Sequence, residues 1–125
     1  MTPLFIEQTP KTPEVLLESG TLSITGRSYP EHPETFYAPV LEAVKKYVAE
    51  NAVPVIIKID LDFCNTGSSK CLLDIFKEFE KALQAGQRIE ITWYYEEDDE
   101  EMLELGEDYN RLLDIPVNLI AHDNE

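Results

Sequence analysis

An alternation of apolar with mainly polar side chains near the middle of the chain constrains the fold more than any other feature. The apolar positions are Val55, Ile57, Ile59, Leu61 and Phe63. Between them lie Ile56, Lys58, Asp60 and Asp62. Such alternation is typical of a β-strand with one buried and one wet face. A parallel sheet covered by helices on both sides would instead have strands that are apolar on both faces.

The other periodicities extend this pattern to the whole chain. They predict strands over 4–6, 14–17, 21–26, 53–63, 88–95 and 117–121, and helices over 34–50, 68–84 and part of 98–113. Gly106 is expected to weaken the middle of the last helix, which either continues through this residue or breaks in two there. We therefore predict an α/β fold, in which a single-layer mixed sheet carries helices mainly on one face. By length, residues 1–125 are expected to form one domain.

The charge balance restricts the partners. The chain has 25 acidic and 10 basic residues, a net charge of −15. Nucleic acid and anionic membrane surfaces would be repelled, whereas basic protein surfaces would be attracted. No stretch has the roughly 18 apolar residues of a membrane span, and the first residues do not resemble a secretory signal. These features indicate a cytoplasmic protein.

Residues with catalytic chemistry are few. His32 and His122 are the only histidines, and neither lies beside a plausible nucleophile, so both are expected to be solvated. Cys64 and Cys71 have the spacing of neither a metal knuckle nor a redox pair, and we expect partly buried thiols. Glycine-rich phosphate loops, zinc-protease motifs and nucleophile elbows do not occur. We predict a protein that is not an enzyme and holds neither a cofactor nor a tight metal ion.

Carboxylates form two groups that allow more than one interpretation. Asp60 and Asp62 share a strand face and are suited to acid–base chemistry, to a divalent cation, or simply to solvation. The segment from Glu96 to Asp108 has nine acidic residues in thirteen, without the register of an EF-hand. It is either a solvated helix start or a docking surface for a basic partner. An acidic metal-dependent sensor or enzyme built on both groups, and a passive scaffold, are alternative functions.

Hydroxyl groups gather where the best strand pattern meets the best helix pattern. The segment reads Asn65-Thr66-Gly67-Ser68-Ser69-Lys70. Backbone N–H groups at a helix start are unpaired and accommodate a phosphate well. The simpler interpretation is that Thr66, Asn65 or Ser68 caps the helix. The pattern by itself allows both a cap and a phosphorylation switch.

Four segments in order resemble one family, the SiaC-type bacterial regulatory phosphoproteins. They are Thr12-Pro13-Glu14 with Gly26-Arg27-Ser28 and Pro30-Glu31; Asn65 to Lys70 with Leu73-Asp74-Ile75-Phe76; Trp93 to Glu100; and Gly106-Glu107-Asp108-Tyr109. The resemblance covers nearly the whole chain. Gly67 departs from the serine that many relatives have at this position.

This resemblance implies a fold similar to the STAS domains of anti-sigma factor antagonists, with the switch hydroxyl at Thr66. It also implies a dedicated protein kinase, a PP2C-like phosphatase and a diguanylate cyclase as partners. The unphosphorylated form would bind and activate the cyclase, and phosphorylation would release it. We expect the rest of the segment from Asn65 to Lys70 to shape the switch loop, with Lys70 within reach of a phosphate or a partner carboxylate. The residues expected at the partner interface are Asp62, Glu96, Glu97, Asp98 and Asp99.

Overall fold

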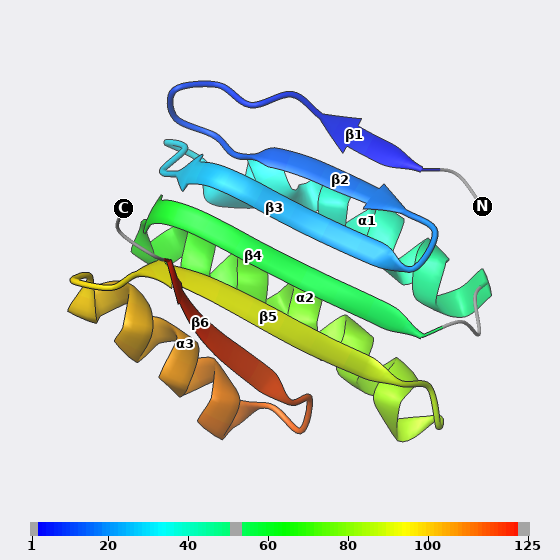
Figure 1. The fold of residues 1–125 in the computed structure, drawn as a ribbon. Helices are drawn as coiled ribbons and strands as arrows, with labels where there is room; N and C mark the ends of the chain where they lie inside the picture. Colours follow the sequence, from blue (N-terminus) through cyan, green and yellow to red (C-terminus); the bar gives the residue numbers. More distant parts are fainter. Residues whose placement is uncertain (1–2, 51–53, 123–125) are drawn as a thin grey trace.

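Six strands form one sheet whose order in space follows their order in the chain (Figure 1). The computed structural model describes residues 3–50 and 54–122, so Val53, the predicted start of the fourth strand, lies outside the described residues. The strands are β1 (Leu4–Ile6), β2 (Glu14–Glu18), β3 (Thr21–Ser28), β4 (Val55–Cys64), β5 (Ile89–Glu96) and β6 (Val117–His122). The first three pair antiparallel, and β4 to β6 continue parallel to β3. The predicted mixed sheet is confirmed.

Three helices connect the parallel strands and lie on the same side of the sheet (Figure 1). They are α1 (Pro33–Glu50), α2 (Thr66–Gln84) and α3 (Glu100–Leu112). Right-handed crossovers between neighbouring parallel strands put successive helices on one face. Trp93, Phe76 and Phe79 are fully buried between the two layers. Across the described residues, no helix combines the length and apolar character that crossing a bilayer demands.

No helix formed by residues 3–50 and 54–122 covers the other face of the sheet. Strand register aligns polar side chains across it, and one such row joins Ser23, Lys58, Thr92 and Asn118. The next row joins Thr25, Asp60, Tyr94 and Ile120. The alternation therefore predicted correctly which side chains of β4 and β5 face away from the helices. We call this surface the open face.

Phe63 is an exception to the alternation. Gly26 pairs with Leu61, but the next residue of β3, Arg27, pairs with Phe63, so β4 contains one extra residue, Asp62. Such a bulge shifts the side-chain alternation by one position. Phe63, predicted to be buried with Leu61, is consequently 49% exposed. The prediction was wrong because the bulge depends on pairing with β3, which the sequence of β4 does not encode.

Gly106 does not break the third helix, so the first of the two expected outcomes holds. α3 continues from Glu100 to Leu112. A Cβ atom at position 106 would lie 2.6 Å from Trp93 Cδ1 and 2.6 Å from Leu119 Cδ2. The glycine thus allows α3 to pack directly on β5 and β6, and this packing outweighs its low helix propensity of about 1 kcal/mol.

Candidate functional site

Thr66 is the first residue of α2, directly after the carboxyl end of β4. Asn65 is the N-cap, since its Oδ1 accepts a hydrogen bond of 2.8 Å from the Ser68 backbone N–H. The Asn65 side-chain amide also donates to the Pro30 carbonyl at 3.3 Å, which ties the cap to the loop before α1. Of the three caps that the sequence allowed, the structure therefore selects Asn65. Thr66 is left without a capping role.

The three hydroxyls of the segment differ in accessibility. Ser68 is fully buried, and its Oγ accepts a hydrogen bond of 2.8 Å from Ser28 Oγ. Ser69 is half-buried, and its hydroxyl donates to the Thr66 carbonyl at 2.8 Å. Thr66 is exposed, and its hydroxyl makes no hydrogen bond to any residue that the structure describes. Of the three hydroxyls, that of Thr66 is the most accessible to a modifying enzyme.

A network of buried, hydrogen-bonded hydroxyls connects this segment to β3 and α1. Ser28 at the end of β3 lies between Ser68 of α2 and Tyr37 of α1, with 2.6 Å between Ser28 Oγ and the Tyr37 hydroxyl oxygen. Burial raises the pKa of Tyr37 well above its ordinary value, so the phenol stays neutral. Sequence reasoning missed this arrangement because a serine that ends a strand ordinarily indicates a turn. This hydroxyl network fixes the start of α2 relative to β3 and α1.

The starts of α1 and α2 meet at this edge of the sheet. A Cβ atom at Gly67 would lie only 2.7 Å from Pro33 Cγ, so the glycine allows close approach of the two helices. α2 has no acidic residue in its first turn, whereas α1 has Glu34 and α3 has Glu100 and Glu101. The partial positive charge at the start of α2 is therefore not neutralised by its own first turn. Lys70, four residues after Thr66, is exposed on the same side of the helix.

α3 is linked directly to the first turn of α2. The Tyr109 hydroxyl donates to the Ser69 carbonyl at 2.7 Å. The Tyr109 ring packs edge-on against Phe76, with 5.1 Å between ring centroids, and against Trp93 at 5.3 Å. Trp93 Nε1–H in turn donates to the Met102 carbonyl at 2.9 Å. The segment from Asn65 to Lys70 is therefore linked, through Tyr109, to the same aromatic cluster that holds α3.

Asp60 is engaged by a histidine from the edge strand β6. His122 Nε2 lies 2.7 Å from Asp60 Oδ1, and the imidazole stacks on Tyr94 with 5.5 Å between centroids. This contact corrects the expectation that His122 is simply solvated. The hydrogen bond to Asp60, together with the charges of Glu96 and Asp62, raises the pKa of His122 above its usual value. Asp62 is exposed and belongs to the bulge.

The acidic segment begins at the carboxyl end of β5 and continues into α3. Asp99 caps α3 by accepting a hydrogen bond of 3.1 Å from the Met102 backbone N–H. Glu97 and Asp98 are exposed, and Glu96 is half-buried. Within residues 3–50 and 54–122, no three histidine, cysteine or carboxylate side chains are arranged to hold a metal ion. Because β4 and β5 are parallel, this segment and Thr66 lie at the same edge of the sheet.

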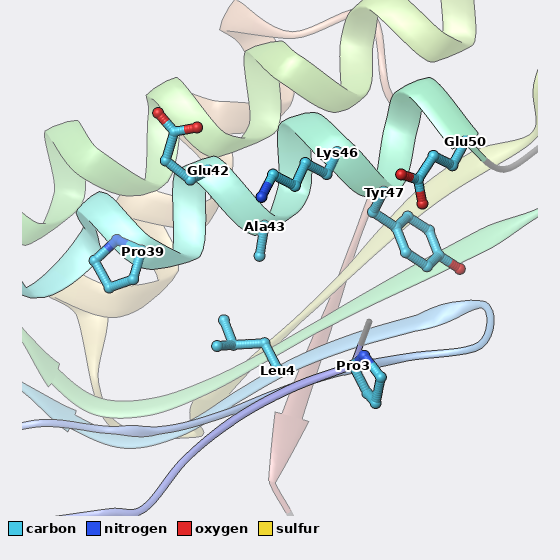
Figure 2. Close-up of a pocket in the computed structure, with 8 residues that line it drawn as sticks. All are labelled: Pro3, Leu4, Pro39, Glu42, Ala43, Lys46, Tyr47 and Glu50. Carbon is cyan, nitrogen blue, oxygen red and sulfur yellow. The ribbon is translucent and has the colours of Figure 1, made fainter. Parts of the chain in front are cut away.

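A separate hollow lies between β1 and α1 (Figure 2). Leu4 of β1 lies opposite Ala43 and Tyr47 of α1, and Glu42, Lys46 and Glu50 are the charged residues around it. These charges follow the outer side of α1, as is usual for a solvated helix face. The hollow is lined by Pro3, by Leu4 of β1 and by residues of α1, with none from the segment Asn65 to Lys70.

Two free thiols lie beside the segment from Asn65 to Lys70, one just before it and one just after it. Cys71 is buried in the second turn of α2, and Cys64 is half-buried at the end of β4. Burial raises the pKa of Cys64 to about 12, so the group is a neutral thiol rather than a nucleophile at pH 7. The expectation of partly buried thiols is confirmed.

Known proteins provide close matches over almost the whole chain. An uncharacterized protein of Pseudomonas aeruginosa strain UCBPP-PA14 is 31% identical over 125 residues, which is 98% of this chain and 99% of that protein. The structure of SiaC of Pseudomonas aeruginosa is 30% identical, with a TM-score of 0.90 over 98% of this chain and 100% of that one. A crystal structure of the diguanylate cyclase SiaD in complex with its activator SiaC, from the same organism, gives 30% identity and a TM-score of 0.89. That match covers 95% of this chain and 99% of the other.

The fold, taken with these matches, defines the class: a small single-layer α/β domain of the regulatory phosphoprotein type. The model of one family within this class matches residues 6–122. The chain belongs to the SiaC family of regulatory phosphoproteins.

Proposed function

We propose that this protein is a switch in bacterial signalling whose binding to a partner protein is controlled by phosphorylation of Thr66. The unphosphorylated form binds and activates an output protein, and the solved complex of a relative with its cyclase makes a diguanylate cyclase the leading candidate. A cognate kinase adds the phosphate, and a PP2C-like phosphatase removes it. Residues 1–125 act as one non-enzymatic domain in the cytoplasm.

The accessibility of Thr66 is the observation that carries this proposal. It is the exposed hydroxyl of the segment, and it lies at the start of the helix whose first turn lacks an acidic residue. A phosphate there adds about −1.5 to −2 charges at a position where the helix dipole favours them. Lys70 offers a further cation one turn away. The domain is therefore expected to stay folded after modification.

Release of the partner follows from repulsion around the phosphate. Asp62 is exposed four residues before Thr66, and Glu96 to Asp99 lie at the same edge of the sheet. These carboxylates favour a basic partner, but a phosphate adds bulk and negative charge where an acidic or tightly packed part of that partner would sit. The alternative of a metal-dependent sensor is less well supported, because Asp60 is bonded to His122 and Asp99 caps α3.

Phosphate labelling of three proteins tests the site. The wild type, Thr66→Ala and the matched control Ser69→Ala are incubated with the kinase purified from the host. Thr66→Ala should take up no label, whereas Ser69→Ala should be labelled like the wild type. Thr66→Ala should change the free energy of unfolding by no more than about 0.5 kcal/mol, because Asn65 provides the cap. Label that persists in Thr66→Ala and maps to Ser68 or Ser69 would show that the residue is wrong.

The consequence of phosphorylation needs a binding measurement. The diguanylate cyclase that co-purifies with the wild type is isolated and titrated with the unmodified and phosphorylated forms. We expect the unmodified form and Thr66→Ala to bind and to activate the cyclase, and the phosphoform to do neither. Equal affinity of both forms would refute the switch mechanism.

A further inference from the structure

The bulge in β4 places an aromatic side chain on the open face beside the proposed switch. Without the extra residue Asp62, Phe63 would continue the buried row that ends with Leu61. With it, Phe63 and Arg27 are register partners, and Phe63 is 49% exposed. Bulges commonly redirect a side chain at a functional site. Burying a phenylalanine favours stability, so its exposure here needs another explanation.

Phe63 forms one wall of a shallow hollow. The hollow has a volume of about 440 Å³ and is lined by Arg27, Tyr29, Asp62 and Phe63. The rings of Tyr29 and Phe63 meet edge to face, with 5.7 Å between centroids and 81° between planes. The pair therefore presents a preformed aromatic surface, with a cation on one strand and an anion on the other. Aromatic residues and arginine are the types that most often dominate the binding energy of protein interfaces.

The hollow is within range of a charge on Thr66. Three residues of extended chain span at most about 11 Å, so the Cα atoms of Phe63 and Thr66 are no farther apart than this. That upper limit is of the same order as the screening length of about 8 Å in physiological salt, so screening weakens the effect of a charge at Thr66 on the hollow without abolishing it. A phosphate on Thr66 would consequently act on anything bound against Phe63. Among the large exposed hydrophobic residues of the described chain, Phe63 is the nearest to Thr66 in sequence.

We propose that the hollow around Phe63 is the docking site for the output protein, and that it takes one aliphatic or aromatic side chain flanked by lysine or arginine. This inference rests on the proposed function and adds the contact surface to it. Apolar complementarity comes from Phe63 and Tyr29. Arg27 is the cation of the hollow, and it is outnumbered by Asp62 in the hollow and by Asp60 and Glu96 near it, so that, with the net charge of −15, the surface is complementary to a basic segment. A second copy of the chain has the same strong negative charge and fits this surface poorly.

Two phenylalanine substitutions compare this site with a matched position. Phe5 is 60% exposed, compared with 49% for Phe63, and it lies in β1, an edge strand of the same sheet, so Phe5→Ala removes a comparable amount of exposed aromatic surface away from the hollow. The unmodified forms of the wild type, Phe63→Ala and Phe5→Ala are titrated with the co-purified cyclase by calorimetry. Phe63→Ala should weaken binding about 30-fold, the loss typical of an aromatic hot spot, and Phe5→Ala less than about twofold. Neither substitution should lower the melting temperature by more than a few degrees.

A photo-cross-link identifies the occupant even if Phe63→Ala folds poorly. Benzoylphenylalanine is placed at position 63, and at position 5 as the control. Illumination should join position 63 to an apolar residue of the cyclase that has lysine or arginine within one helical turn, and position 5 should give no adduct. Equal binding by Phe63→Ala and wild type, or an adduct to a second copy of the chain, would overturn the docking site while the switch at Thr66 stands. If the wild type itself binds no cyclase, the proposed function fails, and the docking site fails with it.

Discussion

His122 shows how a single residue can join strands that are not neighbours. It is the last residue of β6, and its ring stacks on Tyr94 of the neighbouring strand β5. Beyond Tyr94, its Nε2 forms a hydrogen bond with Asp60 of β4. The contact spans 62 positions of the sequence, so nothing local predicts it. Its imidazole fixes the end of the edge strand on the open face. Asp62 and Glu96 add to the negative field around the ring.

Stability should therefore depend on pH through His122. The Asp60 hydrogen bond raises the folded-state pKa of His122 above its unfolded value, so the protonated ring stabilises the fold. This stabilisation is complete below about pH 6.5 and is lost as the pH rises through the raised folded-state pKa. We expect the melting temperature of the wild type to fall by no more than about 4 °C across this window, since the pair is partly exposed. In His122→Gln the fall should disappear, and a folded-state pKa at or below 6.5 by NMR titration would contradict the prediction.

At the scale of elements, α3 depends on a close approach to the sheet. Gly106 lies against Trp93 and Leu119, both of which are fixed by their strands. Tyr109 then reaches across to Ser69 in α2. The glycine is thus required by packing, although it disfavours the helix locally.

Replacing Gly106 by alanine should destabilise the protein in spite of the better helix propensity. The added methyl gains at most about 1 kcal/mol from propensity, whereas overpacking a filled core costs about 1–3 kcal/mol. We expect a net loss of about 1 to 2 kcal/mol in the free energy of unfolding, measured in urea. Glu107→Ala, which changes the exposed neighbour, should stay within about 0.5 kcal/mol. A stabilised Gly106→Ala would show that α3 does not pack as closely as described.

The elements themselves were largely predictable, and their exceptions were not. Alternation and helical spacing report burial directly, so they located the strands, the helices and the open face. The position of Thr66 at a strand-to-helix junction was equally visible. The exposure of Phe63 depends on register with β3, and the continuity of α3 depends on Trp93 and Leu119. The buried hydroxyls of Ser28, Tyr37 and Ser68 come from three elements, and only the folded chain brings them together.

For the whole molecule, we expect the position of the negative charges, more than their total, to guide the approach of a basic partner. The acidic segment and Thr66 share the edge of the sheet at which the parallel strands end. A basic partner approaching this edge would be guided by the carboxylates of Glu96, Glu97, Asp98 and Asp99.

Neutralising these four residues should slow the association of the unmodified protein with its partner. Replacement by glutamine and asparagine should lower the association rate about tenfold at low salt and reduce its salt dependence. Asparagine at position 99 keeps the cap of α3, so the fold should be unaffected. The control removes equal charge at exposed sites elsewhere, namely Glu18, Glu42, Glu50 and Glu90. Equal rates for the two variants, measured by stopped flow, would show that total charge rather than the acidic segment guides the partner.

The spatial order of the six strands also bears on how the chain reaches this structure. Each strand pairs with the one made just before it, so no late strand has to insert between two earlier ones. On a ribosome, every new strand finds a finished neighbour, and each crossover helix arrives together with the strand that it must cover. A sheet that awaits a late central strand has two further unpaired edges, one on each side of the gap, until that strand is made, and such edges invite aggregation. The growing sheet of this chain extends at one edge only, and its incomplete forms expose correspondingly little unpaired backbone.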